Sequence, residues 1–322
     1  MENIIEVANL TKSYGDFLAV DHINFEVKEG EIFGFLGPNG AGKTTTIRML
    51  TGLSGPTAGT ARVLGFDVKS EIVEAKKHIG VVPEISNLYD ELSALKNLMF
   101  MAQLYGIPRD QRKTRAEEIL KTFGLYERKD HLFGTFSRGM KRALTIAAAL
   151  IHSPKLLFLD EPTVGLDVVA ARSLRNLIGN LRHQGVTIFL TTHYLEEADL
   201  LCDRIAILVK GRIVKIDTPK ALKAFAEEES VIEVSFKKVP PKTAEGLSGR
   251  LPELKVVATD NNRVRIYGGV ATHVLEKVIQ YAKDEDAEID DVNSIKPSLE
   301  DSFIKITGLS PSIMAVEKGG GR

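Results

Sequence analysis

The stretch Gly37-Pro38-Asn39-Gly40-Ala41-Gly42-Lys43-Thr44 decides how the rest of this chain is interpreted. It follows the apolar run 31–36 and leads into 45–50, so we expect a strand, a glycine-rich turn and a helix in that order. Successive backbone N–H groups in such a turn face a single anion, and the start of the helix adds positive potential. Lys43 can reach the outer phosphates, and the Thr44 hydroxyl can bind Mg²⁺. The stretch therefore predicts a site for a nucleoside triphosphate.

Length and composition limit the class of protein. The 322 residues suit one large domain and a smaller one, with 43% hydrophobic and 26% charged residues. A formal net charge of -1 implies no general attraction to nucleic acid or anionic lipid. The start of the chain lacks the pattern of a secretory signal, and no run reaches the roughly 18 apolar residues of a membrane span. The single cysteine, Cys202, fits a reducing compartment, so we expect a cytoplasmic protein that reaches a membrane only through a partner.

Strand and helix patterns alternate over the first two thirds of the chain. The runs 4–10 and 23–27 alternate as half-buried strands, and 93–123 has helical periodicity. Two later units each pair a buried strand with a helix: 155–160 with 168–183, and 186–191 with 195–201. This alternation predicts an α/β domain with a mostly parallel sheet between helices.

Two acidic residues end the buried strand 155–160. Asp160 lies where ligands collect in parallel sheets, at the carboxyl end of a strand, and is a candidate ligand for the metal. Glu161 follows directly and can face the attacking water instead. With a phosphate loop in the same chain, these two carboxylates predict a nucleotide hydrolase.

The pattern changes after about residue 229. Strands and helices then follow in the order 231–236, 242–251, 254–258, 263–267, 271–282 and 287–292, which matches a small α+β ferredoxin-like module. A short helix is expected over 299–306, and the Gly- and Ser-rich end is expected to be flexible. We expect an ATP-binding domain over 1–228, an accessory domain over 229–308 and a tail over 309–322.

The string Phe136-Ser137-Arg138-Gly139-Met140-Lys141-Arg142, ahead of Leu156–Thr163, resembles the signature and the Walker B strand of ABC transporter ATP-binding subunits. The resemblance covers residues 4 to about 220. It implies a P-loop NTPase fold with a mostly parallel core sheet, an antiparallel β subdomain and a helical subdomain over about 86–152. It also implies ATP and Mg²⁺ as ligands and ATP hydrolysis coupled to transport.

The resemblance carries roles onto single residues. The ATP-binding set would be Tyr14, which stacks on adenine in the family, with Gly37, Asn39, Gly40, Ala41, Gly42, Lys43, Thr44 and Thr45. The catalytic set would be Lys43, Glu161 and His193, the metal ligands Thr44, Asp160 and Glu84, and the D-loop residue Asp167. The signature residues Ser137, Arg138 and Gly139 would act in trans, on ATP held by a second subunit.

The basic residues of the signature have a physical interpretation of their own. Ser137 and Gly139 precede a helix expected from about Met140, which offers a second anion site at its start. Arg138, Lys141 and Arg142 gather at that same end, where cations oppose the helix dipole. They therefore indicate either a bound phosphate or a solvated basic surface.

Two positions depart from the family pattern. Arg138 replaces a glycine of the signature, and Glu84 replaces the glutamine that usually follows the strand 79–82. A glutamate can bind Mg²⁺ but repels the γ-phosphate when the metal is absent. We therefore expect a steeper Mg²⁺ dependence of hydrolysis than in a Glu84→Gln variant.

The resemblance also implies partners. Two ATP-binding subunits would close head to tail, as a homodimer or with a paired subunit, and would power a separate polytopic permease at the cytoplasmic face of the membrane. The large apolar residues at 88–89, 98–101 and 104–105 are either domain core or a docking surface for that permease. The string 297–308 resembles the end of daunorubicin-resistance-type exporter ATPases, which favours export. The alternatives are a soluble ABC-type ATPase acting on nucleic acid or ribosomes, and an ATP-gated regulator.

Overall fold

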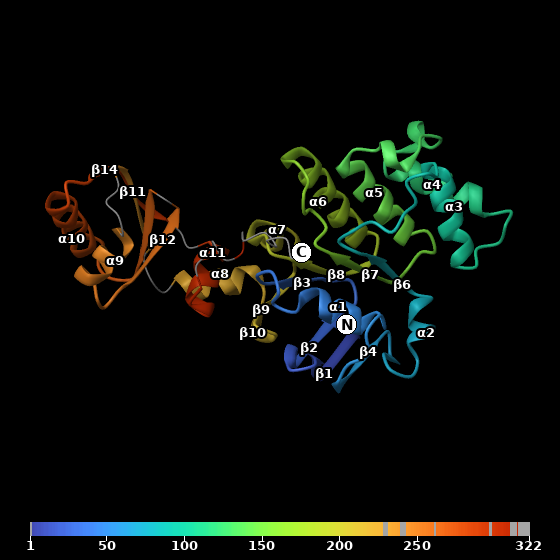
Figure 1. Cartoon of the computed structure of the whole chain (residues 1–322), viewed down its shortest axis with the longest axis horizontal. Helices are drawn as coiled ribbons and strands as arrows, with labels where there is room; N and C mark the ends of the chain where they lie inside the picture. The colour runs from blue at the N-terminus through green and yellow to red at the C-terminus, as the bar shows by residue number, and fades with distance from the viewer. Residues whose placement is uncertain are drawn as a thin grey trace. The chain divides into compact units, whose positions relative to one another are not determined.

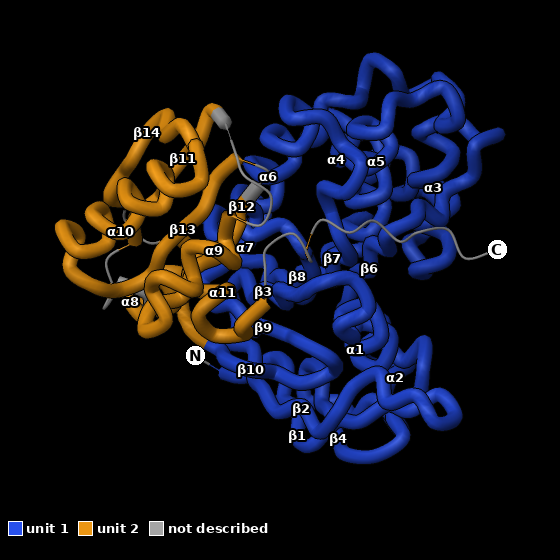
Figure 2. Tube along the Cα trace, turned by 60° about the vertical axis from the view of Figure 1, so that its left-hand side comes forward, with its two compact units in different colours: residues 1–216 blue, residues 217–322 orange. Residues whose placement is uncertain are grey.

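The computed structural model describes residues 2–227, 231–238, 243–260, 262–295, 298–309 and 314. The chain folds as two compact units, residues 1–216 and 217–322 (Figure 2). The division comes before the expected boundary at 228 because helix α8 (Pro219–Glu227) packs on helix α11 (Leu299–Thr307) of the second unit. Most of the expected tail, 309–322, lies outside the described residues, as do Glu228 and Glu229 of the charge run.

A six-stranded sheet forms the centre of the first unit. Its order is β10-β9-β3-β8-β7-β6, and the pairs β9/β3, β3/β8, β8/β7 and β7/β6 are parallel. The strands are β10 (Arg212–Asp217), β9 (Arg204–Val209), β3 (Ile32–Leu36), β8 (Thr187–Thr192), β7 (Leu156–Asp160) and β6 (Ile79–Val82). Strands β3, β7 and β8 are buried throughout, as their continuous apolar runs predict.

Helices and a second sheet cover this core. Figure 1 shows α5 (Arg138–Ala149) and α6 (Val168–His183) on one side of the central sheet and α1 (Lys43–Leu50) on the other. An antiparallel sheet of order β2-β1-β4-β5 comprises β2 (Phe17–Lys28), β1 (Asn3–Tyr14), β4 (Ala58–Val63) and β5 (Phe66–Asp67). The two sheets and α1 share one apolar core, in which Phe25, Phe35 and Phe189 pack with ring centroids 5.0–6.0 Å apart.

The helical part of the first unit has its own core. Helices α3 (Ala94–Leu104) and α4 (Arg112–Thr122) pack with α5 through Leu98, Leu120 and Leu144. The remaining elements of this unit are α2 (Ile72–Lys76), the 3₁₀ turns η1 (Tyr126–Arg128) and η2 (Phe133–Thr135), and α7 (Leu195–Leu201). The expected ABC ATPase fold is therefore confirmed in its three parts.

The second unit is a sheet with helices on it. The antiparallel strands lie in the order β12-β13-β11-β14, and α9 and α10 share an apolar core with them. The elements are β11 (Val231–Lys238), α9 (Thr243–Arg250), β12 (Lys255–Asp260), β13 (Arg263–Tyr267), α10 (Ala271–Asp284) and β14 (Glu288–Ile295). The predicted ferredoxin-like order of strands and helices is confirmed.

The described part of the carboxyl-terminal string stabilises the second unit. Ser298 and Asp301 form a capping box at the start of α11. The Asp301 carboxylate is fully buried and accepts hydrogen bonds from Arg265 at 3.0 Å and from the Tyr267 hydroxyl at 2.7 Å. These bonds join α11 to β13, so this string is explained by packing within its own unit.

His152 joins the end of the helical part to the central sheet. Its ring stacks on Tyr105 with centroids 3.6 Å apart, and Nε2 lies 3.0 Å from the carbonyl oxygen of Ile79. Burial lowers the pKa of His152 from 6.5 to about 4, so the folded protein holds this ring neutral. Between pH 6.5 and about pH 4, His152 is protonated in the unfolded chain and neutral in the folded chain. The free energy of unfolding therefore falls as the pH falls through this range.

We therefore predict that His152→Gln flattens the acid side of the stability curve. The unaltered protein should lose on the order of 2 kcal/mol more than the variant between pH 7 and pH 4. Denaturant unfolding at several pH values measures this difference, and His183→Gln, at an exposed position, is the matched control. Equal slopes for the unaltered protein and His152→Gln would contradict the assignment.

Candidate functional site

The phosphate loop connects β3 to α1. Gly42 caps α1 with a φ of 104°, and a Cβ built there would lie 2.6 Å from the carbonyl oxygen of Ala19. Only glycine satisfies both the left-handed conformation and the close approach. Asn39 and Gly40 lie exposed at the tip of the loop, Ala41 is buried, and Thr45 lies in the first turn of the helix.

Lys43 points into the protein from the first turn of α1. Its ammonium group lies 2.9 Å from Oε1 of Glu161, and both side chains are less than 10% exposed. It also donates hydrogen bonds to the carbonyl oxygens of Gly37 and Pro38, at 2.5 and 3.2 Å. A buried charge needs such partners, so the phosphate loop and the end of β7 are held together by this ion pair.

Asp160 lies beside the start of α1. Its Oδ1 accepts hydrogen bonds from the hydroxyls of Thr44 at 3.2 Å and Thr191 at 2.6 Å. Burial raises the pKa of Asp160, while the two hydroxyls lower it. The hard oxygens of Asp160 and Thr44 are the donors that Mg²⁺ prefers, so this part of the predicted ligand set fits the metal.

Glu161 adopts a backbone conformation that few residues other than glycine adopt, with a φ of 49°. Its N–H donates to Thr191, and its Oε2 lies 2.9 Å from Nδ1 of His193. Burial raises the pKa of Glu161. The hydrogen bond from His193 and the charge of Lys43 together lower it by more, so the net shift of the pKa is downward. The carboxylate is thus held ionised in the folded protein.

Glu84, the third predicted metal ligand, follows β6. The Glu84 side chain is exposed, and its backbone carbonyl accepts a hydrogen bond from Arg142 at 3.3 Å. In the described part of the chain, no three His, Cys, Asp or Glu residues lie close enough together to hold a metal. Tyr14 is 47% exposed at the end of β1, and the Lys12 ammonium lies 5.1 Å from its ring centroid.

The signature and D-loop residues form a second group. Ser137 caps α5 by accepting from the Met140 N–H at 3.3 Å, so the helix begins at Arg138 instead of the expected Met140. A Cβ on Gly139 would lie 2.9 Å from Cβ of Ala170 in α6. Asp167 caps α6, and Arg138 donates to the carbonyl oxygen of Gly165 at 3.4 Å. Close packing of α5 on α6 thus fixes the signature residues and Asp167 relative to one another.

The three basic residues grouped at the start of this helix have separate surroundings. Arg138 is exposed, Lys141 lies 2.8 Å from Asp90, and Arg142 is buried among backbone carbonyls. The interpretation of Arg142 as part of a basic cluster facing phosphate or solvent is therefore wrong. Sequence reasoning also missed Thr191, whose only signal is a polar residue at the end of a buried strand.

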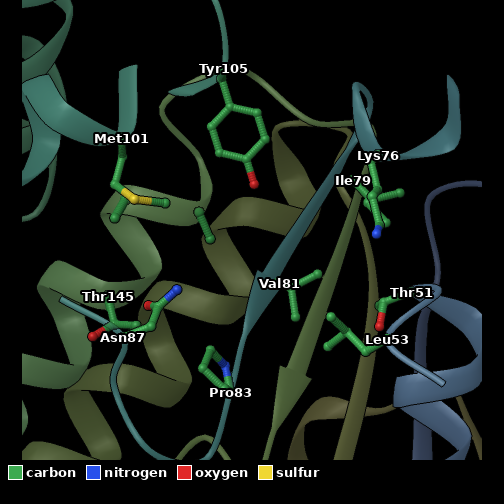
Figure 3. A pocket seen from close by; sticks show the side chains of 12 residues that line it. Thr51, Leu53, Lys76, Ile79, Val81, Pro83, Asn87, Met101, Tyr105 and Thr145 are labelled. Carbon is green, nitrogen blue, oxygen red and sulfur yellow. The ribbon is translucent and has the colours of Figure 1, made fainter. Parts of the chain in front are cut away.

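A pocket of about 320 Å³ lies between the central sheet and the helical part of the first unit. Figure 3 shows Met101 and Tyr105 on one side of it, and Val81 and Leu53 opposite. Among the apolar residues of the 88–105 segment, Leu98 is buried in the helical core, and Met101 and Tyr105 pack against that core and also line the pocket. Tyr89 and Leu104 are exposed. No helix in the described residues is long and apolar enough to cross a membrane.

Comparisons with known proteins show which family this chain resembles. The family model described as ABC transporter matches residues 20–164. The chain is 36% identical over 307 residues to the linearmycin resistance ATP-binding protein LnrL of Bacillus subtilis (strain 168), covering 95% of this chain and 98% of that protein. It is 43% identical over 220 residues to the daunorubicin/doxorubicin resistance ATP-binding protein DrrA of Streptomyces peucetius, covering 68% and 67% of the two chains.

Solved structures resemble about two thirds of this chain. An ATP-binding subunit of an ABC transporter has a TM-score of 0.62 at 31% identity, covering 69% of this chain and 92% of that one. A dimeric ATP-binding cassette in a post-hydrolysis state, bound to ADP and Pi, has a TM-score of 0.61 at 28% identity, covering 66% and 98%.

We predict that the Lys43–Glu161 pair is strongly coupled in stability. Lys43→Met leaves a buried carboxylate without its countercharge and should lower the free energy of unfolding by about 3 kcal/mol. Lys43→Met/Glu161→Gln removes both charges and should restore at least half of that loss. Denaturant unfolding without nucleotide measures both effects.

The exposed pair Lys77–Glu74, at 2.7 Å, provides the matched control. Lys77→Met should change stability by less than about 0.5 kcal/mol. If Lys43→Met were as harmless as Lys77→Met, the buried ion pair would not stabilise the site.

Proposed function

This chain belongs to the family of ABC transporter ATP-binding subunits, and from that premise we propose which of its residues bind and hydrolyse ATP and which surface meets the permease. The enzyme is an ATPase that powers transport, and its relatives named for drug resistance support an exporter. The observation that carries the residue assignment is the buried contact of Lys43 with Glu161, beside Asp160 and Thr44.

The phosphate loop binds the triphosphate in this proposal. Backbone N–H groups of the loop and of the first turn of α1 face the phosphates, and Lys43 exchanges its contact with Glu161 for the outer phosphates. Tyr14 stacks on the adenine. When bound, Mg²⁺ would neutralise charge on the β- and γ-phosphates, held by Thr44 and Asp160 with Glu84 as a further ligand.

Glu161 acts as the base in the proposed reaction. It accepts a proton from water as the water oxygen bonds to the γ-phosphorus and the bond to the β–γ bridging oxygen breaks, releasing ADP. The Lys43 charge lowers the pKa of Glu161, so moving Lys43 onto phosphate makes the carboxylate a stronger base. His193, which contacts Glu161, donates a hydrogen bond to the γ-phosphate.

A second subunit completes the site in this proposal. Ser137, Arg138 and Gly139 lie at the start of α5, a 12-residue helix whose dipole favours an anion there, and Asp167 caps the neighbouring α6. They would close on ATP held by Lys43 of the other subunit. The dimeric cassette bound to ADP and Pi supports this arrangement, in a homodimer or with a paired subunit.

The permease is proposed to dock at the pocket lined by Met101, Tyr105 and Val81. Its walls are largely apolar, and the flexible Met101 can adapt to a helix from another chain. This contact would place the subunit at the cytoplasmic face of the membrane.

The test of the chemistry is Glu161→Gln. Removing the base should lower kcat by at least about 100-fold while ATP still binds, so the variant should form an ATP-dependent dimer in gel filtration. Glu74→Gln, at an exposed position, should hydrolyse ATP like the unaltered protein. Unchanged hydrolysis would refute the role of Glu161, and a variant that stays monomeric with ATP would refute closure by a second subunit.

The test of the partner is purification from membranes. The chain should co-purify with a polytopic membrane protein, and Met101→Glu should abolish this by placing a charge in the pocket while leaving ATP affinity unchanged. Val270→Glu, at an exposed apolar position of the second unit, is the control. Recovery of ribosomes or DNA in place of a membrane protein would overturn the transport assignment.

A further inference from the structure

Arg142 makes an unusual set of contacts. It extends from the second turn of α5 and is 8% exposed. A guanidinium group has five N–H donors, and here they meet five backbone carbonyl oxygens. The acceptors are Pro162 at 2.9 Å from Nε, Asp160 and Glu161 at 2.6 and 3.1 Å from one terminal nitrogen, and Glu84 at 3.3 Å and Pro83 from the other.

These carbonyls lie at the ends of β6 and β7, where the strands stop and their backbone groups need other partners. One side chain of the signature helix therefore holds two loops. One loop carries Asp160 and Glu161, and the other carries Glu84.

Arg142 also lies among acids. Burial lowers its pKa to about 10, and the charges of Asp160, Glu197, Glu84 and Glu161 oppose that shift. The guanidinium thus stays charged at neutral pH and offsets a local excess of carboxylates. Glu197 is almost fully buried, and burial raises its pKa while hydrogen bonds with Thr192 and Thr163 lower it.

We propose that Arg142 is a positioning residue of the ATPase site: it fixes the ends of β6 and β7 against the signature helix and supplies the charge that offsets Glu84. The proposal rests on the proposed function of Asp160, Glu161 and Glu84. Asp160 and Glu161 would act on the ATP bound by their own subunit, and the signature would contact the ATP bound by the second subunit. Arg142 connects these two parts of the subunit into one rigid group.

The test separates geometry from charge with four variants. Arg142→Lys keeps the charge but has three donors for five carbonyls, whereas Arg142→Gln removes the charge. Glu84→Gln and Arg142→Gln/Glu84→Gln complete a double-mutant cycle. Arg112→Gln is the matched control, since Arg112 also donates to a backbone carbonyl, that of Ile107 at 2.7 Å, away from the site.

Two quantities are measured for each protein: kcat, and the ratio of the dissociation constants of a fluorescent ATP analogue without and with Mg²⁺. Arg142→Gln should raise the ratio at least fivefold, because a more negative site repels the bare nucleotide. The double variant should return it to within twofold of the unaltered protein, and Glu84→Gln alone should lower it. Arg142→Lys should keep the ratio within twofold but lower kcat about tenfold.

A double variant whose ratio stays as high as that of Arg142→Gln, or an unchanged ratio in Arg142→Gln, would overturn the charge role. Full activity in Arg142→Lys would overturn the positioning role. If Arg142→Gln does not fold, the ratio in Glu84→Gln and the kcat of Arg142→Lys still decide both points. Hydrolysis by the unaltered chain tests the proposed function separately, so failure of the two proposals can be distinguished.

Discussion

The buried ion pair between Lys43 and Glu161 is the interaction on which the rest of the site depends. Parallel strands place the residues that follow β3, β7 and β8 at one edge of the sheet. That edge is mostly closed to water, so each charge there needs a partner within the protein. The hydroxyls of Thr44 and Thr191 and the ring of His193 meet this need around the two carboxylates.

Local patterns made much of this predictable. The phosphate loop and the strand ending in Asp160 are contiguous stretches whose chemistry can be read from the sequence, and alternation of strands and helices predicted the parallel sheet. The role of Arg142 could not be predicted, because its partners are backbone carbonyls more than 15 positions away, which no residue type encodes. Glu84 was predicted as a metal ligand from its place in a family pattern, and that role stays a prediction.

The motif at the end of the second unit has a structural explanation that its sequence did not indicate. The string around Ser298 and Asp301 looked like a mark of one exporter class. In the structure, Asp301 is the buried acceptor that fixes α11 to Arg265 and Tyr267. A buried carboxylate that accepts several hydrogen bonds needs its donors in defined positions. This packing role accounts for an aspartate at position 301 without a role in nucleotide binding.

The backbone of Glu161 has a consequence for how this sequence can change. Its left-handed conformation costs about 1 kcal/mol relative to glycine, which adopts it freely. Replacement by glycine would remove that cost but would leave the buried Lys43 ammonium without its carboxylate partner. Because breaking a buried ion pair costs about 3 kcal/mol, more than the backbone would gain, stability itself retains an acid at this position. Positions 43 and 161 should therefore change together over evolution, not one at a time.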